Sequence, residues 1–289
     1  MLLKYVKIIL EGDYMLINSN EILTKALKEG YAIPAYNINN LEWARFILEE
    51  CNKDNAPVIL GVSESAISYM GGFKTVANLV RNLVEELNIK IPVVLHLDHG
   101  KSVETCKNAI DAGFTSVMLD ASSKSFDENV RETIEVISYA KNKNVSVEAE
   151  IGSLNGENTN LDEAKDFAIQ TGVDSLAPSV GNLHGIYEEE VKLDFDLLGG
   201  ICKSAKVPLV LHGASGLDEN KIKTAIFCGV SKININTDLQ IAWSTSLRKF
   251  LTYDSNVYDP RVIIKSGEVS LKKKVHEKNE FFGCINKAN

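Results

Sequence analysis

Eight short apolar runs, rich in β-branched residues, alternate along the chain with longer stretches whose apolar residues recur at helical spacing. Parallel strands need a crossover segment, usually a helix, so this alternation predicts an α/β fold, a (β/α)8 TIM barrel. The nearly continuous apolar character of the runs is typical of a sheet buried on both faces. The eight predicted strands are AIPAYNI (32–38), APVILGVS (56–63), IPVVLHLDH (91–99), TSVMLDA (115–121), VSVEAEIG (145–152), DSLAPSVG (174–181), VPLVLHG (207–213) and KININT (232–237).

The chain has 289 residues, a length that suits one such barrel, and no break in composition divides it. Residues 1–14 contain an apolar stretch interrupted by Lys4 and Lys7, and residues of the helix-capping type follow only after Met15. We therefore expect residues 1–14 to be an N-terminal extension outside the fold. Residues 15–289 are expected to form the barrel, with an additional C-terminal helix over 266–281.

The net charge indicates which kinds of partner the protein binds, and the cysteines indicate the cellular compartment in which it works. Lys and Arg number 31 against 39 Asp and Glu, a net charge of −8, which argues against nucleic acid or an anionic membrane as the main partner. Five scattered cysteines with no C-x-x-C pair are typical of the reducing cytoplasm, so a cytoplasmic protein is expected. No apolar run approaches the ~20 residues needed to span a bilayer.

Polar residues follow the predicted strands where each one ends. In TIM barrels the active site lies at the carboxyl ends of the strands, so these side chains should meet on one rim. Three of the five histidines are among them, namely His99, His184 and His212. Each alone would be an ordinary hydrogen-bonded residue, but three together favour a catalytic zinc site with an open position. His96 and His276 are expected to be structural.

Three carboxylates accompany these histidines, and spacing leaves their roles open. Asp98 could move protons beside a cation, or it could orient a histidine. Asp120 and Glu150 follow neighbouring strands and could hold a second cation. Spacing alone favours ordinary rim acids for that pair.

Two glycine-containing segments follow the last two predicted strands, HGASG (212–216) and NINTD (234–238). The loops at these places are the usual phosphate site of a TIM barrel. Gly213 and Gly216 let backbone N–H groups approach an anion, and Ser215 and Thr237 add hydroxyl donors. Tight turns would also use these glycines, but the two segments together indicate a phosphate site.

These residues together resemble the zinc-dependent class II fructose-bisphosphate/ketose-bisphosphate aldolases. The combination of HLDHG, HGASG and NINT is highly specific, and the resemblance covers nearly everything from Met15 onward. The matching segments are PVILGVSESAISYMGGF (57–73), VVLHLDHGKSVETCKNAIDAGFTSVMLDAS (93–122), VSVEAEIG (145–152), TGVDSLAPSVGNLHGIY (171–187), VPLVLHGASGL (207–217), KININTDLQIAW (232–243) and YDPR (258–261).

The resemblance implies a role for each group of rim residues. Asp98 resembles the general acid/base. The residues that resemble catalytic zinc ligands are His99, His184 and His212, and those that resemble a second site, for a divalent or monovalent cation, are Asp120 and Glu150. The residues expected to bind the substrate, most of them resembling the dihydroxyacetone phosphate site, are Asn37, Ser63, Gly185, Gly213, Ala214, Ser215, Asn234, Ile235, Asn236 and Thr237. Arg261 resembles an arginine that reaches a neighbouring subunit, which implies a homodimer or homotetramer.

One segment departs from the family pattern. After EAEIG the family carries a long mobile loop beginning T-x-G-G-x-E-D, which supplies a catalytic carboxylate, whereas this chain reads SLNGENTNLDEAKDF. The loop is shorter by roughly ten residues, about the length of an active-site lid. Glu157 is the nearest candidate for the carboxylate. Asn182 also replaces the usual small hydroxyl residue near His184.

The sequence thus predicts a carbon–carbon lyase that cleaves or forms a ketose phosphate from dihydroxyacetone phosphate and an aldehyde. Fructose 1,6-bisphosphate is the expected ketose, with tagatose 1,6-bisphosphate and a deoxy-ketogluconate phosphate as alternatives. A catalytically weak relative that binds metal and phosphate is another alternative, because of the short loop. A Schiff-base aldolase is disfavoured, since Lys232 stands at the start of the predicted strand 232–237 and not at its reactive end.

Overall fold

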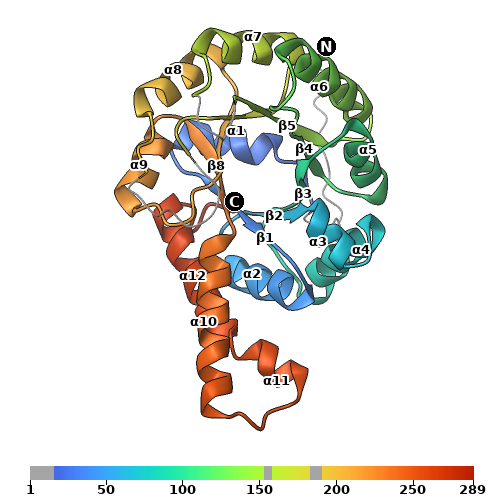
Figure 1. Ribbon diagram of the computed structural model, residues 1–289, viewed down its shortest axis with the longest axis vertical. Coiled ribbons are helices and arrows are strands. Elements are labelled where there is room, and N and C mark those ends of the chain that lie inside the picture. The colour runs from blue at the N-terminus through green and yellow to red at the C-terminus, as the bar shows by residue number, and fades with distance from the viewer. Residues whose placement is uncertain (1–15, 153–157, 183–190) are drawn as a thin grey trace, which may run out of the picture.

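The computed structural model, which describes residues 16–152, 158–182 and 191–289, is a closed barrel of eight parallel strands surrounded by helices (Figure 1). Strand β1 pairs with β8 as well as β2, which closes the sheet, so the predicted TIM barrel is confirmed. The strands are β1 (Ile33–Asn37), β2 (Val58–Ser63), β3 (Val93–Gly100), β4 (Ser116–Leu119), β5 (Ser146–Ile151), β6 (Ser175–Pro178), β7 (Leu209–Leu211) and β8 (Val230–Ile235).

Helices connect successive strands and cover the outside of the barrel. They are α1 (Asn20–Glu29), α2 (Leu41–Lys53), α3 (Glu64–Tyr69), α4 (Phe73–Glu86), α5 (Val103–Ala112), α6 (Phe126–Lys141), α7 (Leu161–Thr171), α8 (Phe195–Ala205), α9 (Glu219–Phe227), α10 (Thr237–Tyr253), α11 (Pro260–Lys265) and α12 (Glu268–Phe282). The sequence pattern did not predict α3 and α11. Six residues make less than two turns, too few to show a helical period.

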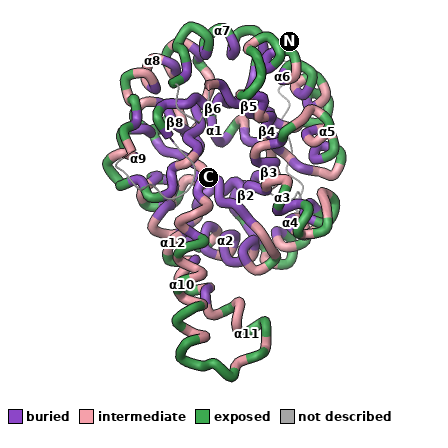
Figure 2. The backbone as a smooth tube through the Cα atoms, viewed as in Figure 1, coloured by how far each residue is buried: buried purple, intermediate pink, exposed green. Residues whose placement is uncertain are grey.

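The core lies between the sheet and the inner faces of the helices, and Figure 2 shows this buried backbone surrounded by an exposed outer ring. Local signals set where the helices begin. The Asn40 side chain accepts a hydrogen bond from the N–H of Trp43 at the start of α2, and Ser125 and Glu128 form a capping box on α6. These caps orient each helix as it leaves the loop that follows the preceding strand.

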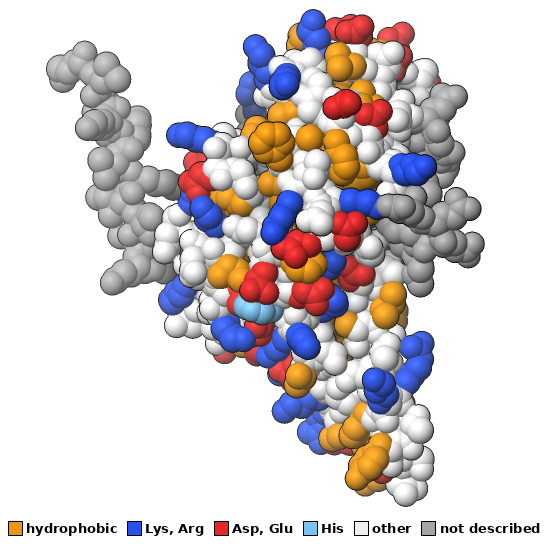
Figure 3. Space-filling model, turned by 90° about the vertical axis from the view of Figure 1, so that its left-hand side faces the viewer, with side chains coloured by type: hydrophobic (Ala, Val, Ile, Leu, Met, Phe, Trp, Pro, Cys, Tyr) orange, Lys and Arg blue, Asp and Glu red, His pale blue; other side chains and the backbone are white. Residues whose placement is uncertain are grey.

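One part of the molecule extends away from the barrel. Helix α10 runs outward from the end of β8, and α11 lies near its far end, so the two form an arm (Figure 1). Tyr253 and Tyr258 on this arm are 93% and 91% exposed. Figure 3 shows apolar side chains near the tip of the arm and on the upper part of the same face, and acidic and basic side chains intermingled between these two regions.

The amino-terminal segment 1–14, expected to lie outside the fold, falls outside the described residues. The chain is already attached to the barrel at Leu16, which bridges to Val93 of β3, and the Ile17 N–H donates to the carbonyl of Val93. No helix within the described ranges is long and apolar enough to cross a bilayer.

Candidate active site

A cavity of roughly 160 Å³ opens at the carboxyl ends of the strands, where the sequence places the active site. Its walls combine a carboxylate, two imidazoles, amides and hydroxyl groups. The lining residues are Asn37, Asp98, His99, His212, Gly213, Ser215, Asn234, Asn236 and Thr237. Each of them is a residue for which the sequence predicts a role, and they come from the ends of β1, β3 and β8 and the loop after β7.

A bulge in β3 explains how two consecutive residues face the same cavity. Side chains of a regular strand alternate between faces, so Asp98 and His99 would point to opposite sides. The register with β4 shifts between Leu97 and Gly100, and His99 has a φ of 51°, in the left-handed region that only a few per cent of non-glycine residues adopt. A bulge redirects a side chain, and this one turns His99 toward the cavity.

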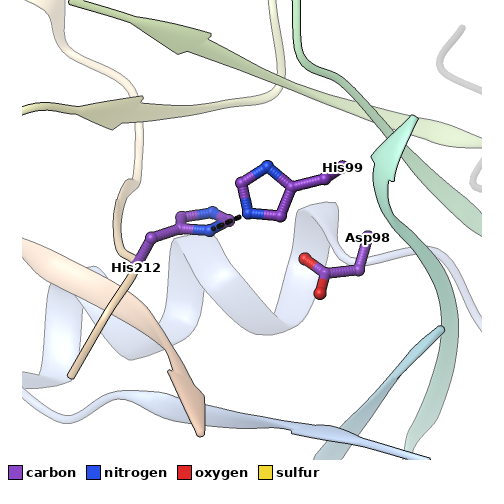
Figure 4. A group of neighbouring side chains, drawn as sticks. All are labelled: Asp98, His99 and His212. Carbon is purple, nitrogen blue, oxygen red and sulfur yellow. Dashed lines mark hydrogen bonds between the residues drawn. The ribbon is translucent and has the colours of Figure 1, made fainter. Parts of the chain in front are cut away.

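The rings of His99 and His212 meet edge to face above this cavity, and Asp98 points toward the pair (Figure 4). The Nε2 atom of His99 lies 3.0 Å from the Nδ1 atom of His212. Carboxylates hold the opposite nitrogens. Asp120 Oδ2 lies 3.0 Å from His99 Nδ1, and Glu148 Oε1 lies 2.9 Å from His212 Nε2. An ionised carboxylate only accepts, so each ring donates outward and turns its other nitrogen toward the neighbouring ring.

This geometry fits a metal ion. Two acceptor nitrogens 3.0 Å apart repel each other unless a proton or a cation lies between them. Zinc binds imidazole nitrogens at about 2.0–2.1 Å, and two such ligands at a tetrahedral angle stand about 3.3 Å apart, close to the observed separation. Ligand atoms of Asp98, His99 and His212 all lie within 4.8 Å of one another. The donor set and its orientation are those of a divalent cation site.

Without a cation, the pair is suited to hold a proton. Burial alone would lower the pKa of His99. The hydrogen bond to Asp120 and the negative charges of Asp98 and Glu150 outweigh burial and raise the pKa of His99 to about 9. The carboxylates that favour the protonated form of His99 would also favour a metal cation bound at its Nε2 atom.

Asp98 is held by two amides. Its Oδ2 accepts from Asn37 Nδ2 at 2.8 Å, and its Oδ1 accepts from Asn234 Nδ2 at 3.1 Å. Burial would raise the pKa of Asp98, but the positive charges of His99, His212 and Lys232 and the Asn37 hydrogen bond lower it below its usual value. Asp98 is therefore an ionised carboxylate that can accept a proton.

Asp120 and Glu150 flank the outer side of His99, and ligand atoms of the three residues lie within 4.8 Å of one another. Burial, followed by the charge of Asp120, raises the pKa of Glu150 to about 8. Its Oε2 atom is buried and makes no hydrogen bond among the described residues, although it lies 3.7 Å from His99 Nδ1. An orphaned carboxylate oxygen is costly, and a cation at this position would satisfy it.

The loop after β7 and the start of α10 form the other wall of the cavity. Gly213 and Gly216 have φ values of 64° and 84°, so the loop uses a backbone conformation that favours glycine. The Asn236 side chain does not cap the amino end of α10, and its Oδ1 atom is buried without a hydrogen-bond partner among the described residues. In the first turn of α10 the Asp238 N–H donates a long hydrogen bond of 3.5 Å to Ser215 Oγ. A helix start that its own N-cap side chain leaves open, with glycine turns beside it, favours an anion.

Several residues with predicted roles do not line the cavity. Ser63 caps α3, although its backbone stands beside Asp98 in the sheet register. Ala214 and Ile235 are buried, so only their backbone could face a ligand. Arg261 lies at the start of α11, on the arm, where its side chain is 88% exposed and pairs with Asp259. The predicted residues His184, Gly185 and Glu157 lie outside the described residues.

Two charged side chains beneath the rim were not predicted from the sequence. Glu148 and Lys232 form a buried ion pair in the barrel interior. The placement of Lys232 was wrong, because β8 begins at Val230 and Lys232 is its third residue. The available signal was a charged residue in the middle of a buried strand, which rarely occurs unpaired. Asn182 is also used, since its Nδ2 donates to the carbonyl of His212 at 3.1 Å.

The known proteins that this chain resembles in sequence are fructose-bisphosphate aldolases. Residues 17–287 match the family model described as fructose-bisphosphate aldolase class-II. A fructose-bisphosphate aldolase of Geobacillus stearothermophilus is 48% identical over 283 residues, covering 94% of this chain and 99% of the relative, and one of Staphylococcus aureus is 46% identical over the same coverage.

Solved structures with a similar fold are also aldolases. The YdjI aldolase of Escherichia coli K12 superposes with a TM-score of 0.85 at 31% identity, covering 95% of this chain and all of that one. A fructose-bisphosphate aldolase of Campylobacter jejuni superposes with a TM-score of 0.84 at 27% identity, covering 95% and 97%.

Proposed function

Because the chain belongs to the class II fructose-bisphosphate aldolase family, we propose that it cleaves fructose 1,6-bisphosphate reversibly into dihydroxyacetone phosphate and glyceraldehyde phosphate. The observation that carries the proposal is the pair of imidazole nitrogens 3.0 Å apart, each ring anchored by a carboxylate, with Asp98 beside them. Such a site can bind a cation next to a proton acceptor, and aldol cleavage needs both.

We assign zinc to the nitrogens of His99 and His212, with His184 as the third ligand that the sequence predicts. A zinc ion bound there would polarise the ketone and stabilise the negative charge that develops on its oxygen. Asp120 and Glu148 hold the outer ring nitrogens, so the ligand nitrogens stay aimed at the cation. Asp120 and Glu150 are proposed to hold a second cation, which the orphaned Glu150 Oε2 favours.

Asp98 is proposed as the general acid/base. In cleavage, the C4 hydroxyl gives its proton to Asp98, the C4 oxygen becomes the aldehyde carbonyl, and the C3–C4 bond breaks with its electrons remaining on the C3 side. In condensation Asp98 returns the proton. Its lowered pKa and its two amide partners keep it ionised and fixed, as a base must be. Protonation of the dihydroxyacetone phosphate carbon is assigned to Glu157, on the sequence prediction alone.

The phosphate of dihydroxyacetone phosphate is proposed to bind at the start of α10 and the glycine turn after β7. Gly213, Ser215 and Thr237 already line the cavity there. Asp238 supports this wall, because its Oδ2 accepts from the N–H of Gly216 at 3.3 Å and pairs with the buried ammonium of Lys278 at 2.7 Å.

Three broader features complete the proposal. Residues 15–289 act as one barrel domain, with residues 1–14 outside it. The protein works in the cytoplasm, as expected of an enzyme of sugar phosphate metabolism. It forms a homodimer or homotetramer through the arm, whose exposed Tyr253 and Tyr258 suit a contact between subunits and whose Arg261 reaches a neighbour's cavity.

A retro-aldol assay tests the function. Purified chain is incubated with fructose 1,6-bisphosphate, tagatose 1,6-bisphosphate or a deoxy-ketogluconate phosphate, and the triose or aldehyde released is measured before and after chelation and zinc return. We expect fastest cleavage of fructose 1,6-bisphosphate, lost with chelator and restored by zinc. A higher kcat/KM for another ketose would reassign the substrate, and chelator-resistant cleavage would contradict the metal assignment.

A further inference from the structure

A polar layer fills the barrel just beneath the rim, where TIM barrels ordinarily pack bulky branched side chains. Four side chains from different strands form it: His96 of β3, Ser116 of β4, Glu148 of β5 and Lys232 of β8. None is more than 2% exposed. A buried charge is tolerated only if it is paired and hydrogen-bonded. The position of each side chain in this layer is therefore restricted by its hydrogen-bond partners.

The layer is one continuous chain of hydrogen bonds that ends at His212. Ser116 Oγ lies 2.8 Å from His96 Nδ1, and His96 Nε2 lies 3.2 Å from Lys232 Nζ. Lys232 Nζ lies 2.7 Å from Glu148 Oε2, and Glu148 Oε1 lies 2.9 Å from His212 Nε2. The chain therefore connects the barrel interior to a proposed metal ligand.

The ammonium of Lys232 determines the direction of each bond in this chain, because it can only donate. His96 Nε2 must accept from it, so the proton of His96 is on Nδ1 and is donated to Ser116. Glu148 Oε2 also accepts from Lys232, and its Oε1 then accepts the Nε2–H of His212. The Nδ1 atom of His212 is left with its lone pair, consistent with Asn234 Nδ2 lying 3.3 Å from it.

We propose that Glu148 and Lys232 are positioning residues for metal binding: Lys232 fixes the carboxylate of Glu148, which holds His212 in the tautomer whose Nδ1 faces His99. The inference rests on the proposed function only in taking His212 as a metal ligand. The Glu148–Lys232 ion pair then positions a metal ligand in addition to any contribution to the stability of the fold. Buried ion pairs are often no more stabilising than apolar residues of the same volume, so stability alone explains this one poorly.

Glu148→Gln gives a sharp test because Lys232 remains. The amide NH2 cannot face an ammonium, so the amide oxygen turns to Lys232 and the NH2 group turns to His212. His212 Nε2 must then accept, and its proton moves to Nδ1, where it blocks the metal. We expect zinc affinity to fall about 10- to 100-fold, the usual loss when the partner of a ligating histidine is changed.

The double variant Glu148→Gln with Lys232→Met separates positioning from stability. Without the ammonium the amide can turn its oxygen to His212, so the original tautomer returns. Zinc affinity should therefore recover relative to Glu148→Gln alone. Ser116→Ala is the matched control, since it removes the far end of the same buried chain without reaching His212. Its zinc affinity should equal that of the unchanged chain.

Two measurements decide the outcome. Zinc affinity comes from competition with a chromophoric chelator, with the visible spectrum of the Co2+ form as a check on geometry. The tautomer of His212 comes from ¹⁵N chemical shifts of the metal-free chain, which keeps the test independent of zinc. Circular dichroism confirms that each variant is folded. We expect the His212 proton on Nε2 in the unchanged chain and on Nδ1 in Glu148→Gln.

The inference is overturned if the His212 tautomer is the same in both, or if the double variant binds zinc no better than Glu148→Gln. If the tautomer shifts as expected while the unchanged chain fails to bind zinc, the positioning of His212 stands and the proposed metal function falls. The two failures are therefore distinguishable.

Discussion

The Nε2 atom of His99 and the Nδ1 atom of His212 lie 3.0 Å apart although 113 positions separate the residues in the chain. Two structural causes bring them together. A bulge in β3 turns His99 into the cavity, and the barrel closes so that the end of β7 faces the end of β3. Each ring is locked at its opposite nitrogen, which makes the pair a preformed half of a metal site.

The first prediction concerns this pair. His99→Ala should remove a ligand nitrogen and abolish stoichiometric zinc binding, measured as zinc per chain after dialysis. The unchanged chain should retain roughly one equivalent. Arg248→Ala, an exposed arginine on α10, is the control that should leave the zinc content unchanged. Equal zinc content in His99→Ala and the unchanged chain would contradict the site.

The second prediction separates proton transfer from binding. Asp98→Asn keeps the shape of the side chain but removes its basicity, so turnover should fall about 10²- to 10⁴-fold, the usual range for a general acid/base. Zinc content and dihydroxyacetone phosphate affinity should be nearly unchanged. Loss of zinc along with turnover would show that Asp98 mainly supports the metal site.

A third prediction follows from the raised pKa of His99. With a pKa of about 9 in the metal-free chain, His99 is protonated at neutral pH, and zinc must displace that proton. Lower pH strengthens the competing proton and weakens zinc binding. The apparent zinc affinity should therefore rise about tenfold per unit between roughly pH 6 and pH 8 and level off above the pKa.

Calorimetry in two buffers of different ionisation enthalpy measures the protons released per zinc bound. Zinc affinity that does not change over this pH range would mean that the nitrogen pair carries no proton, and the electrostatic account of His99 would be wrong.

The sequence predicted the strands and the rim residues because both follow from periodic patterns. A buried strand is a short apolar run, and a polar residue at its carboxyl end lies on the rim of any TIM barrel. Asn37, Asp98 and His212 could therefore be assigned to one cavity before any coordinates. Arg261 could not be placed in this way, because it lies at the start of the short helix α11, which follows no predicted strand, and its side chain is 88% exposed.

The polar layer could not be predicted for a different reason. Glu148 and Lys232 are 84 positions apart, and only the closed barrel brings them within 2.7 Å. A charged residue in the middle of a strand signals that a partner exists, but the strand pattern does not say which one. His99 was assigned to the rim from its place at the end of a strand, but no sequence pattern reveals the bulge that turns its side chain into the cavity.

The fourth prediction concerns the first residues of the chain. A protein that begins at Met15 should fold and melt like the full chain, because the barrel attachment through Leu16 and Ile17 is kept. Melting temperature and aldolase activity of the two forms measure this. A drop of several degrees on removal of residues 1–14 would indicate that this segment contributes to the packed structure.

The last prediction tests whether Arg261 serves a neighbouring subunit. Arg261 lies on the arm, 88% exposed, so it can reach a second chain more readily than the cavity of its own. If so, Asp98→Asn chains and Arg261→Ala chains, each nearly inactive alone, should complement each other in mixed oligomers. In a mixed dimer one cavity has both intact Asp98 and its neighbour's Arg261, so random mixing should recover roughly a quarter of the full activity.

Arg248→Ala, an exposed arginine on α10, is the control that should remain active alone. No recovery on mixing, despite exchange of subunits shown by mass spectrometry, would confine Arg261 to its own chain or to a role outside catalysis.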